Sequence, residues 1–188
     1  MDVLEAIRGR RSIRRFSPEP VSDGELRTVL EAARWAPSWA NTQCWEIVVV
    51  RDPAKKKALS ELLVPERNPA REAVAEAPVV LAVCGRRGVS GFYKGKAVTD
   101  KGDWYMFDVA LAVQNMCLAA HALGLGTVIV GALDHAKAAK LLGLPENVEL
   151  VVLLPLGRPA QEPKAPPRKA LEEFVHEEGF GRPWGGQR

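Results

Sequence analysis

The sequence predicts one domain of the α/β or α+β class, with helices covering both faces of a sheet. Short apolar runs typical of buried strands alternate along the chain with amphipathic segments of helical period. In addition, the stretch 103–124 is apolar on almost every side until Gly124 and Gly126 end it. A helix of that kind is buried at the centre of a domain or in a subunit interface. The length of 188 residues suits a single core of ordinary size.

The first half of the chain supplies clear boundaries. Ser22 and Glu25 stand at capping-box spacing before an apolar helical repeat, so a helix is predicted from about Asp23 to Trp35, and Pro37 stops it. Three elements are predicted next, a β-branched strand, an amphipathic helix that begins with a proline, and a second buried strand: 45–51, 53–63 and 77–85.

The second half begins with a long stretch, Gly85 to Gly102, that lacks apolar periodicity and is predicted to be a functional or disordered loop. Asp103 is the predicted N-cap of the apolar helix that follows. Two more strands are predicted at 127–133 and 148–157, with a short helix between them that Gly143 ends. The Pro- and Gly-rich tail holds one helical piece, 171–179. We therefore expect a single domain over 1–157 and a C-terminal tail over 158–188.

Composition and motifs exclude several classes of protein. The chain has 47% hydrophobic residues, but no apolar run reaches the length of a membrane helix. Asp2 and Glu5 stand where a signal peptide would be apolar. A cytoplasmic protein is therefore expected. Three widely spaced cysteines indicate neither a disulfide framework nor a zinc site, and the histidines lack metal-ligand spacing, so no metal is expected. P-loop, nucleophile-elbow and dinucleotide-binding patterns are absent from the sequence.

The segment Arg8 to Phe16, RGRRSIRRF, holds five arginines in a chain of net charge +3. Spacing alone leaves three interpretations: a solvated basic surface, a nucleic-acid site, or a site for one small anion. An aromatic content of 6% and the lack of a second basic stripe argue against nucleic acid. In an extended segment Arg10, Ser12 and Arg14 project to one side, and guanidinium groups with a hydroxyl suit a phosphate monoester.

A resemblance favours the third interpretation. RRSIRRF followed by APSWANTQCWEIVVV resembles the start of the nitroreductase family of FMN-dependent oxidoreductases, which opens with R-x-S-x-(K or R) and carries P-S-x-x-N-x-Q-P-W before a strand. LAAHALGLGTVIVGALD resembles the family's buried helix, glycine-rich stop and flavin-facing strand, and ELVVLLPLGRP with PPRKALEEFVH resembles its last strand and tail. The resemblance runs from about residue 3 to 178. It implies an α+β sandwich, with a mostly antiparallel sheet flanked by helices, and an intertwined homodimer whose tails pack on the partner subunits.

The resemblance also implies roles for particular residues. Arg10 and Ser12 would bind the FMN phosphate, with Arg11 beside them and Arg168 closing the site from the tail. Arg14 matches a basic residue near the pyrimidine edge of the flavin, where a fixed cation stabilises the anionic reduced ring. The loop that reaches the flavin from the second subunit is matched by Pro37, Ser38 and Asn41. The strand end that faces flavin N5 is matched by Gly131 and Ala132, and a polar position on the buried helix is matched by Gln114.

Two positions of the matched loop stand out. Cys44 occupies the place where the family usually has proline, and Trp39 is placed either to line the substrate face or to serve as a plain core aromatic residue.

The implied activity is transfer of hydride from NADH or NADPH, through flavin N5, to an electrophilic acceptor such as a nitroaromatic compound or a quinone. One site serving both substrates in turn gives ping-pong kinetics. The flavin carries the hydride, so no catalytic side chain is expected. The alternative is a flavin-binding carrier or sensor without reductase turnover. The expected partners are a second copy of the chain and a small-molecule acceptor, with no nucleic acid and no membrane.

Overall fold

Four strands form the central sheet in the part of the chain that the computed structural model describes, residues 1–185. They lie in the order β1 (Trp45–Val50), β2 (Val79–Arg86), β6 (Val148–Gly157) and β5 (Gly126–Thr127), and each neighbouring pair is antiparallel. The predicted α+β class with a mostly antiparallel sheet is therefore confirmed. Residues 186–188 of the predicted tail lie outside the described residues.

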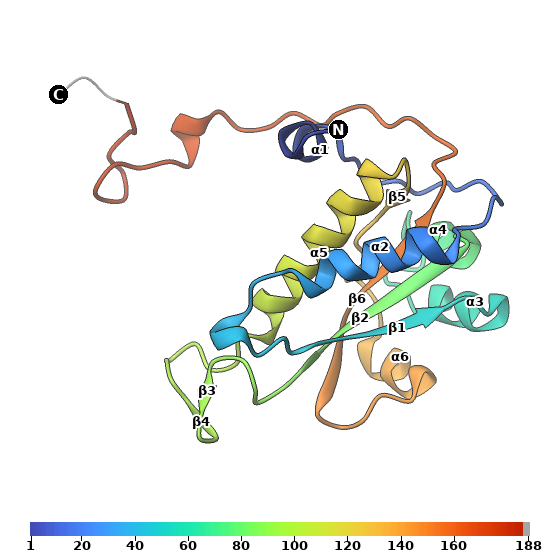
Figure 1. Ribbon diagram of the computed structural model, residues 1–188, viewed down its shortest axis with the longest axis horizontal. Coiled ribbons are helices and arrows are strands. Elements are labelled where there is room, and N and C mark those ends of the chain that lie inside the picture. Colours follow the sequence, from blue (N-terminus) through green and yellow to red (C-terminus); the bar gives the residue numbers. More distant parts are fainter. Residues whose placement is uncertain (186–188) are drawn as a thin grey trace.

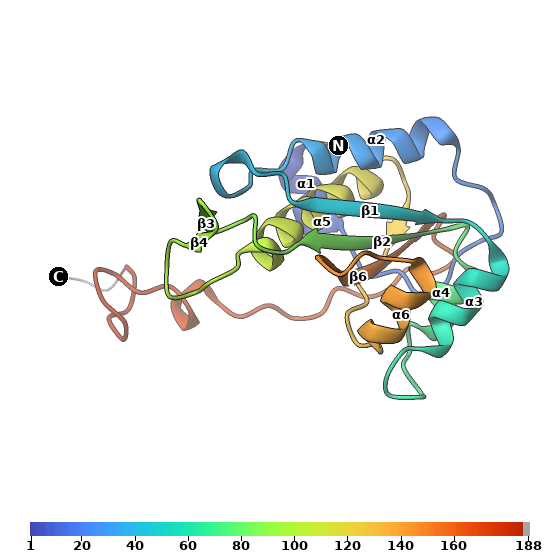
Figure 2. The same ribbon diagram turned by 90° about the horizontal axis from the view of Figure 1, so that it is seen from below.

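Helices cover both faces of this sheet (Figures 1 and 2). On one face lie α2 (Asp23–Arg34) and the long helix α5 (Tyr105–Ala122). On the other face lie α3 (Pro53–Glu61), α4 (Arg71–Glu76) and α6 (His135–Leu142). The core is thus divided into two layers, one on each side of the sheet.

Strand β2 shows how its sequence serves both layers. Successive side chains of a strand point to opposite faces, and Val79, Leu81 and Val83 face α2 and α5, whereas Val80, Ala82 and Cys84 face the other three helices. Each of these side chains is almost fully buried, which explains why this strand reads as a continuous apolar run.

Helix α5 has a buried middle and an exposed side. Its middle is buried as predicted, through residues such as Val109, Ala112 and Met116. Near its C-terminal end it packs against α1 (Val3–Gly9), which precedes the arginine-rich segment. It also retains an exposed side: Gln114 is exposed, as are Met106 and Phe107 in the first turn.

Local capping chemistry explains most helix boundaries. The capping box between Ser22 and Glu25 is present at the start of α2, and Gly143 ends α6 in the left-handed conformation that favours glycine. The prediction of Asp103 as the N-cap of α5 was wrong. The N-cap is Trp104, and the Asp103 carboxylate accepts hydrogen bonds from the Tyr105 N–H at 3.2 Å and from the Gly88 N–H at 2.7 Å.

The predicted strand 127–133 is reduced to the two-residue β5 and an isolated bridge between Val130 and Leu153. The pairing register with β6 is the same at both places. In that register Val128 lies opposite Pro155, which has no N–H to donate to the ladder. The missing donor explains why continuous pairing stops after Thr127.

Two further predictions need correction. The predicted loop 85–102 contains a small hairpin of β3 (Phe92–Tyr93) and β4 (Lys96–Ala97), because Lys94 and Gly95 take the positive φ values of a type I′ turn. The predicted helix 171–179 is only the 3-10 turn η2 (Leu171–Glu173). A short segment without a core to pack on does not sustain a helix, and this tail runs away from the body in both views (Figures 1 and 2).

Helix α4 was not predicted from the sequence.

Among residues 1–185, no helix is long and apolar enough to span a membrane.

Candidate functional site

The segment after α1 and the tail meet at a surface pocket of about 330 Å³. Residues 12 and 13 run beside β5, where Ser12 forms a parallel bridge with Thr127 and the Ile13 N–H donates to the Thr127 carbonyl at 2.9 Å. Ile13 is buried, so its neighbours on either side point outward. The pocket is lined by Arg10, Arg11, Ser12, Arg14, Pro163, Lys164, Pro166 and Arg168.

Positive charge dominates this pocket. Five of its lining residues are arginine or lysine, and none of the lining residues, all within the described chain, is acidic. Arg15 differs from Arg14. Its guanidinium pairs with the Glu72 carboxylate at 3.0 Å, and neither of these two residues lines the pocket. The Arg11 guanidinium is held locally by donating to the carbonyls of Arg8 at 2.6 Å and Arg10 at 2.8 Å. Convergent guanidinium groups with one hydroxyl form a site suited to an anion such as a phosphate monoester.

The structure thus brings together five of the residues predicted from the sequence: Arg10, Arg11, Ser12, Arg14 and Arg168. Lys164, a sixth polar member, was missed, although it belongs to the same basic, proline-rich stretch as Arg168 and Lys169.

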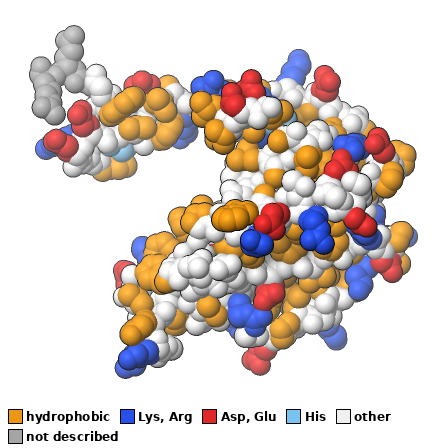
Figure 3. All heavy atoms as spheres, in the orientation of Figure 1, with side chains coloured by type: hydrophobic (Ala, Val, Ile, Leu, Met, Phe, Trp, Pro, Cys, Tyr) orange, Lys and Arg blue, Asp and Glu red, His pale blue; other side chains and the backbone are white. Residues whose placement is uncertain are grey.

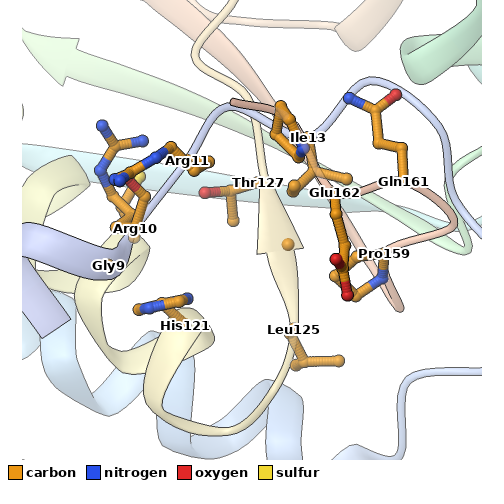
Figure 4. A pocket seen from close by; sticks show the side chains of 13 residues that line it. Gly9, Arg10, Arg11, Ile13, His121, Leu125, Thr127, Pro159, Gln161 and Glu162 are labelled. Atoms are coloured by element: carbon orange, nitrogen blue, oxygen red, sulfur yellow. The ribbon is translucent and has the colours of Figure 1, made fainter. Parts of the chain in front are cut away.

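A second pocket, of about 390 Å³, shares Arg10 and Arg11 with the first and lies between α1, the end of α5 and the start of the tail (Figure 4). His121 of α5 lines it. Burial, and then the charges of Arg10 and Arg11, lower the pKa of His121. The imidazole is therefore neutral at neutral pH, and the positive charge of this region comes from the arginines. Glu162 is the acidic residue among those lining this second pocket.

Gly131 and Ala132 lie in the segment between β5 and α6 and are both exposed. The Ala132 carbonyl accepts a hydrogen bond from the Val64 N–H at 2.9 Å. The two ring nitrogens of His135 lie 2.9 Å from the carbonyl oxygens of Gly131 and Leu150. The backbone at this position is therefore held from both sides, by the loop after α3 and by the first residue of α6.

The loop between α3 and α4 was not predicted to border this region. Besides the Val64 contact, Leu63 bridges Leu133, and the side chains of Asn68 and Arg71 donate to the carbonyls of Val64 at 2.9 Å and Leu63 at 2.7 Å. The sequence feature that could have indicated this loop is its group of polar residues between two prolines, Pro65 and Pro69.

Pro37, Ser38 and Asn41 lie elsewhere in the chain. The loop ends in the 3-10 turn η1 (Trp39–Asn41), beside the first turn of α5, where the Trp39 N–H donates to the Asp108 carboxylate at 3.0 Å. The arginine pocket lies near the other end of α5, beside His121. His121 follows Asp108 by thirteen positions in the helix, which is about 20 Å at about 1.5 Å per residue. One chain therefore does not join this loop to the arginine pocket (Figure 1), and Gln114 lies on α5 between the two.

The model of the nitroreductase family matches residues 7–158, which include the arginine segment, the Pro37–Asn41 loop and all of α5. The chain belongs to the nitroreductase family. A protein from Thermus thermophilus named NADH dehydrogenase is 32% identical to it, with 93% of this chain and 95% of that protein covered.

Two further relatives of this nitroreductase family protein are named for their substrates. FMN reductase [NAD(P)H] from Bacillus subtilis is 31% identical, over 95% of this chain and 74% of the relative. The solved structure of NADPH:FMN oxidoreductase from Vibrio harveyi complexed with NAD+ has a TM-score of 0.78 and 31% identity, covering 94% of this chain and 77% of that one.

Aromatic side chains gather next to the Pro37–Asn41 loop. The ring centroids of Trp39 and Trp104 are 5.5 Å apart, and those of Trp104 and Phe107 are 5.6 Å apart. Phe107 is exposed, so this group presents an apolar surface beside the loop. Trp39 is half-buried in the group rather than in the sheet core.

Cys44, the departure from the family pattern, is buried. Burial, and then the nearby Asp108 carboxylate, raise the pKa of this thiol to about 12. The thiol stays protonated at neutral pH and is not a nucleophile. In the described chain, no group of three His, Cys, Asp or Glu side chains is arranged to hold a metal ion.

Proposed function

We propose that this member of the nitroreductase family is an FMN-dependent oxidoreductase that transfers hydride from NADH or NADPH to an electrophilic small molecule. The observation that carries the proposal is the pocket where five cationic side chains and Ser12 converge from both ends of the chain. The names of the B. subtilis and V. harveyi relatives support FMN and a nicotinamide as the ligands. The acceptor would be a nitroaromatic compound, a quinone or a related conjugated molecule.

The residues present fit the phosphate end of FMN. A terminal phosphate has several acceptor oxygens and about two negative charges, which bidentate guanidinium groups and a hydroxyl match. Arg10, Ser12 and Arg168 would hold it, with Arg11 and Lys164 adding charge. None of the described residues that line this pocket is acidic, so a bound anion meets no negative charge that would repel it.

Bound FMN would supply the hydride chemistry through its N5 atom. Arg14, which lines the same pocket from the far side of Ser12, would place a fixed positive charge where negative charge develops on reduction. The backbone of Gly131 and Ala132 would face the reacting edge, held in place by Val64 and His135. No side chain is assigned as a general acid or base.

The complete site would be built from two chains, with Pro37, Ser38 and Asn41 supplied by the partner subunit. The separation of about 20 Å along α5 supports a second copy as the source of the loop that meets the arginine pocket. The chain also exposes apolar side chains that a partner would cover, including Leu4 and Ile7 on α1 and Phe174 and Phe180 in the tail. Figure 3 shows hydrophobic side chains along the tail, which projects from the body. The start of the tail is held by its own chain, through Ala160 and the residues that line the arginine pocket. We propose that the rest of the tail, from Lys169 onward, packs on the partner in a homodimer.

The test is the visible absorption spectrum of the purified protein before and after anaerobic addition of NADH or NADPH. Flavin bands should bleach and should return when a nitroaromatic compound or a quinone is added. Bands that resist bleaching by both nucleotides would favour the flavin carrier or sensor instead. A colourless protein that takes up no added FMN would refute the proposal.

A further inference from the structure

Asp108, in the first turn of α5, is a buried carboxylate that the proposed chemistry does not use. It is 1% exposed, and no ion pair joins it to a lysine or arginine within the described chain. Burying an unpaired carboxylate is costly unless several donors satisfy it. The groups that donate to Asp108 therefore indicate its role.

The donors to Asp108 come from two separate loops. The Trp39 N–H donates to both oxygens, at 3.0 and 3.2 Å, and Thr42 Oγ1 and Cys44 Sγ lie 3.4 and 3.6 Å from Oδ2. The hydroxyl of Ser90, which is fully buried, donates to Oδ2 at 2.7 Å. The Ser90 carbonyl in turn accepts the Trp104 N–H at 3.1 Å, at the base of the β3–β4 hairpin.

The loop held by Asp108 has a strained backbone. Ala40, Asn41 and Gln43 have φ values of 43°, 57° and 48°, in the left-handed region that non-glycine residues rarely adopt. Such a conformation persists only where the surroundings determine it strongly. The contacts to Asp108 flank these residues on both sides, at Trp39 before them and at Cys44 after them.

We propose that Asp108 is a positioning residue: its carboxylate holds the Trp39–Cys44 loop in the strained conformation that presents Asn41, and couples this loop to the base of the β3–β4 hairpin. The presentation of Asn41 to flavin rests on the proposed function, whereas the anchoring of the loop does not.

A carboxylate suits this position better than an amide. A carboxylate only accepts hydrogen bonds, and its neighbours here donate to it, although the hydroxyls of Thr42 and Ser90 could also accept. In Asp108→Asn an NH₂ group replaces one oxygen, so these hydroxyls must reverse their direction, and the charge that strengthens the hydrogen bonds is lost. The change keeps the size of the side chain, so its effect reports the loss of acceptors and charge rather than a cavity.

The first experiment measures hydrogen–deuterium exchange of the purified protein with peptide resolution. In Asp108→Asn the amides of residues 39–44 should exchange at least about tenfold faster, while those of β2 keep their rates. Asp103→Asn is the matched control, since that carboxylate accepts from Gly88 at the same hairpin but does not contact the loop. Unchanged exchange in residues 39–44, or an equal increase in β2, would overturn the anchoring role.

The second experiment tests the link to flavin through the dissociation constant of FMN and the visible circular dichroism of the bound flavin. Asp108→Asn and Asn41→Ala should each weaken FMN binding by about tenfold and change the dichroism in the same way, with the double variant no worse than either single one. Additive effects would overturn the role of Asp108 in presenting Asn41. A wild-type protein without FMN affinity would refute the proposed function and this second role together, and exchange would still decide the anchoring.

Discussion

Arg168 in the tail and Arg10 at the end of α1 line the same pocket, although nearly the whole chain separates them in sequence. The polypeptide leaves β6 at Gly157 and passes the arginine-rich segment, where the Ala160 N–H donates to the Arg15 carbonyl at 2.9 Å. The first part of the tail is thereby tied to the body. Its residues Lys164 and Arg168 line the arginine pocket, and the roles of these residues can be tested separately.

Replacing Arg168 by alanine should weaken FMN binding about 10- to 100-fold, because a hydrogen bond to a charged group contributes about 1.5–3 kcal/mol. Lys169→Ala is the control, since Lys169 is adjacent and exposed but does not line the pocket. The dissociation constants can be measured by quenching of flavin fluorescence. Equal effects of the two variants would show that the tail contributes general charge rather than a specific contact.

Replacing Arg14 by glutamine should lower the reduction potential of bound FMN and slow reduction by NADH or NADPH, because a fixed cation that stabilises the anionic reduced ring is lost. Arg15→Gln removes the same charge from a side chain that pairs with Glu72, so it should leave the potential close to that of the wild type. Spectroelectrochemical titration measures both. An unaltered potential and turnover in Arg14→Gln would contradict the electrostatic role.

The close approach of β5 to the arginine segment predicts a stability effect. A Cβ at Gly126 would lie 2.6 Å from Ile13 Cγ1, so Gly126→Ala should destabilise the fold by about 1–3 kcal/mol through overpacking. It should also weaken FMN binding, because Ile13 lies between Ser12 and Arg14. A Cβ at Gly24, in helix α2, meets no atom within 4 Å, so Gly24→Ala should be neutral or stabilising. Urea denaturation distinguishes the two.

His121 predicts a pH dependence of stability. Its pKa in the folded protein is lowered from 6.5, first by burial and then by Arg10 and Arg11. The unfolded chain therefore binds a proton at a higher pH than the folded protein does, so stability is lost as the pH falls through and below 6.5. Between about pH 7.5 and about pH 5.5, His121→Gln should lose less stability than the wild type.

Phosphate bound beside Arg10 and Arg11 should offset their charges and raise the pKa of His121, a change that NMR titration detects. His176 in the tail serves as the internal reference. A His121 titration curve unmoved by FMN, in a protein that binds it, would contradict the proposed position of the phosphate.

The proposed homodimer predicts that sedimentation velocity finds two chains per particle. Phe180, 95% exposed in the single chain, should be covered by the partner, so Phe180→Asp should shift the protein toward monomer. Leu141→Asp, on α6 across the sheet from α5, should not. A monomeric wild type that still binds FMN tightly would show that one chain suffices for the site.

Several features could be predicted from the sequence because their signals are local. The Ser22–Glu25 capping box sets the start of α2, and the apolar runs of β1, β2 and β6 predict strands within one or two residues. The alternation of Arg10, Ser12 and Arg14 around buried Ile13 also follows from the sequence, because side chains of an extended segment alternate. Signals carried by residues a few positions apart survive folding unchanged.

The remainder was decided by contacts between segments distant in sequence. Residues 127–133 have strand composition, yet Pro155 on β6 interrupts their ladder, and only the register places it opposite Val128. The tail helix fails because it has no surface of its own chain to pack on. Asp108 appears in the sequence as one acidic residue in an apolar helix, and its role depends on Trp39 and Ser90 converging on it. The sequence by itself determined the family, the helix caps and the cationic segment, whereas tertiary structure alone decided which distant donors and acceptors meet.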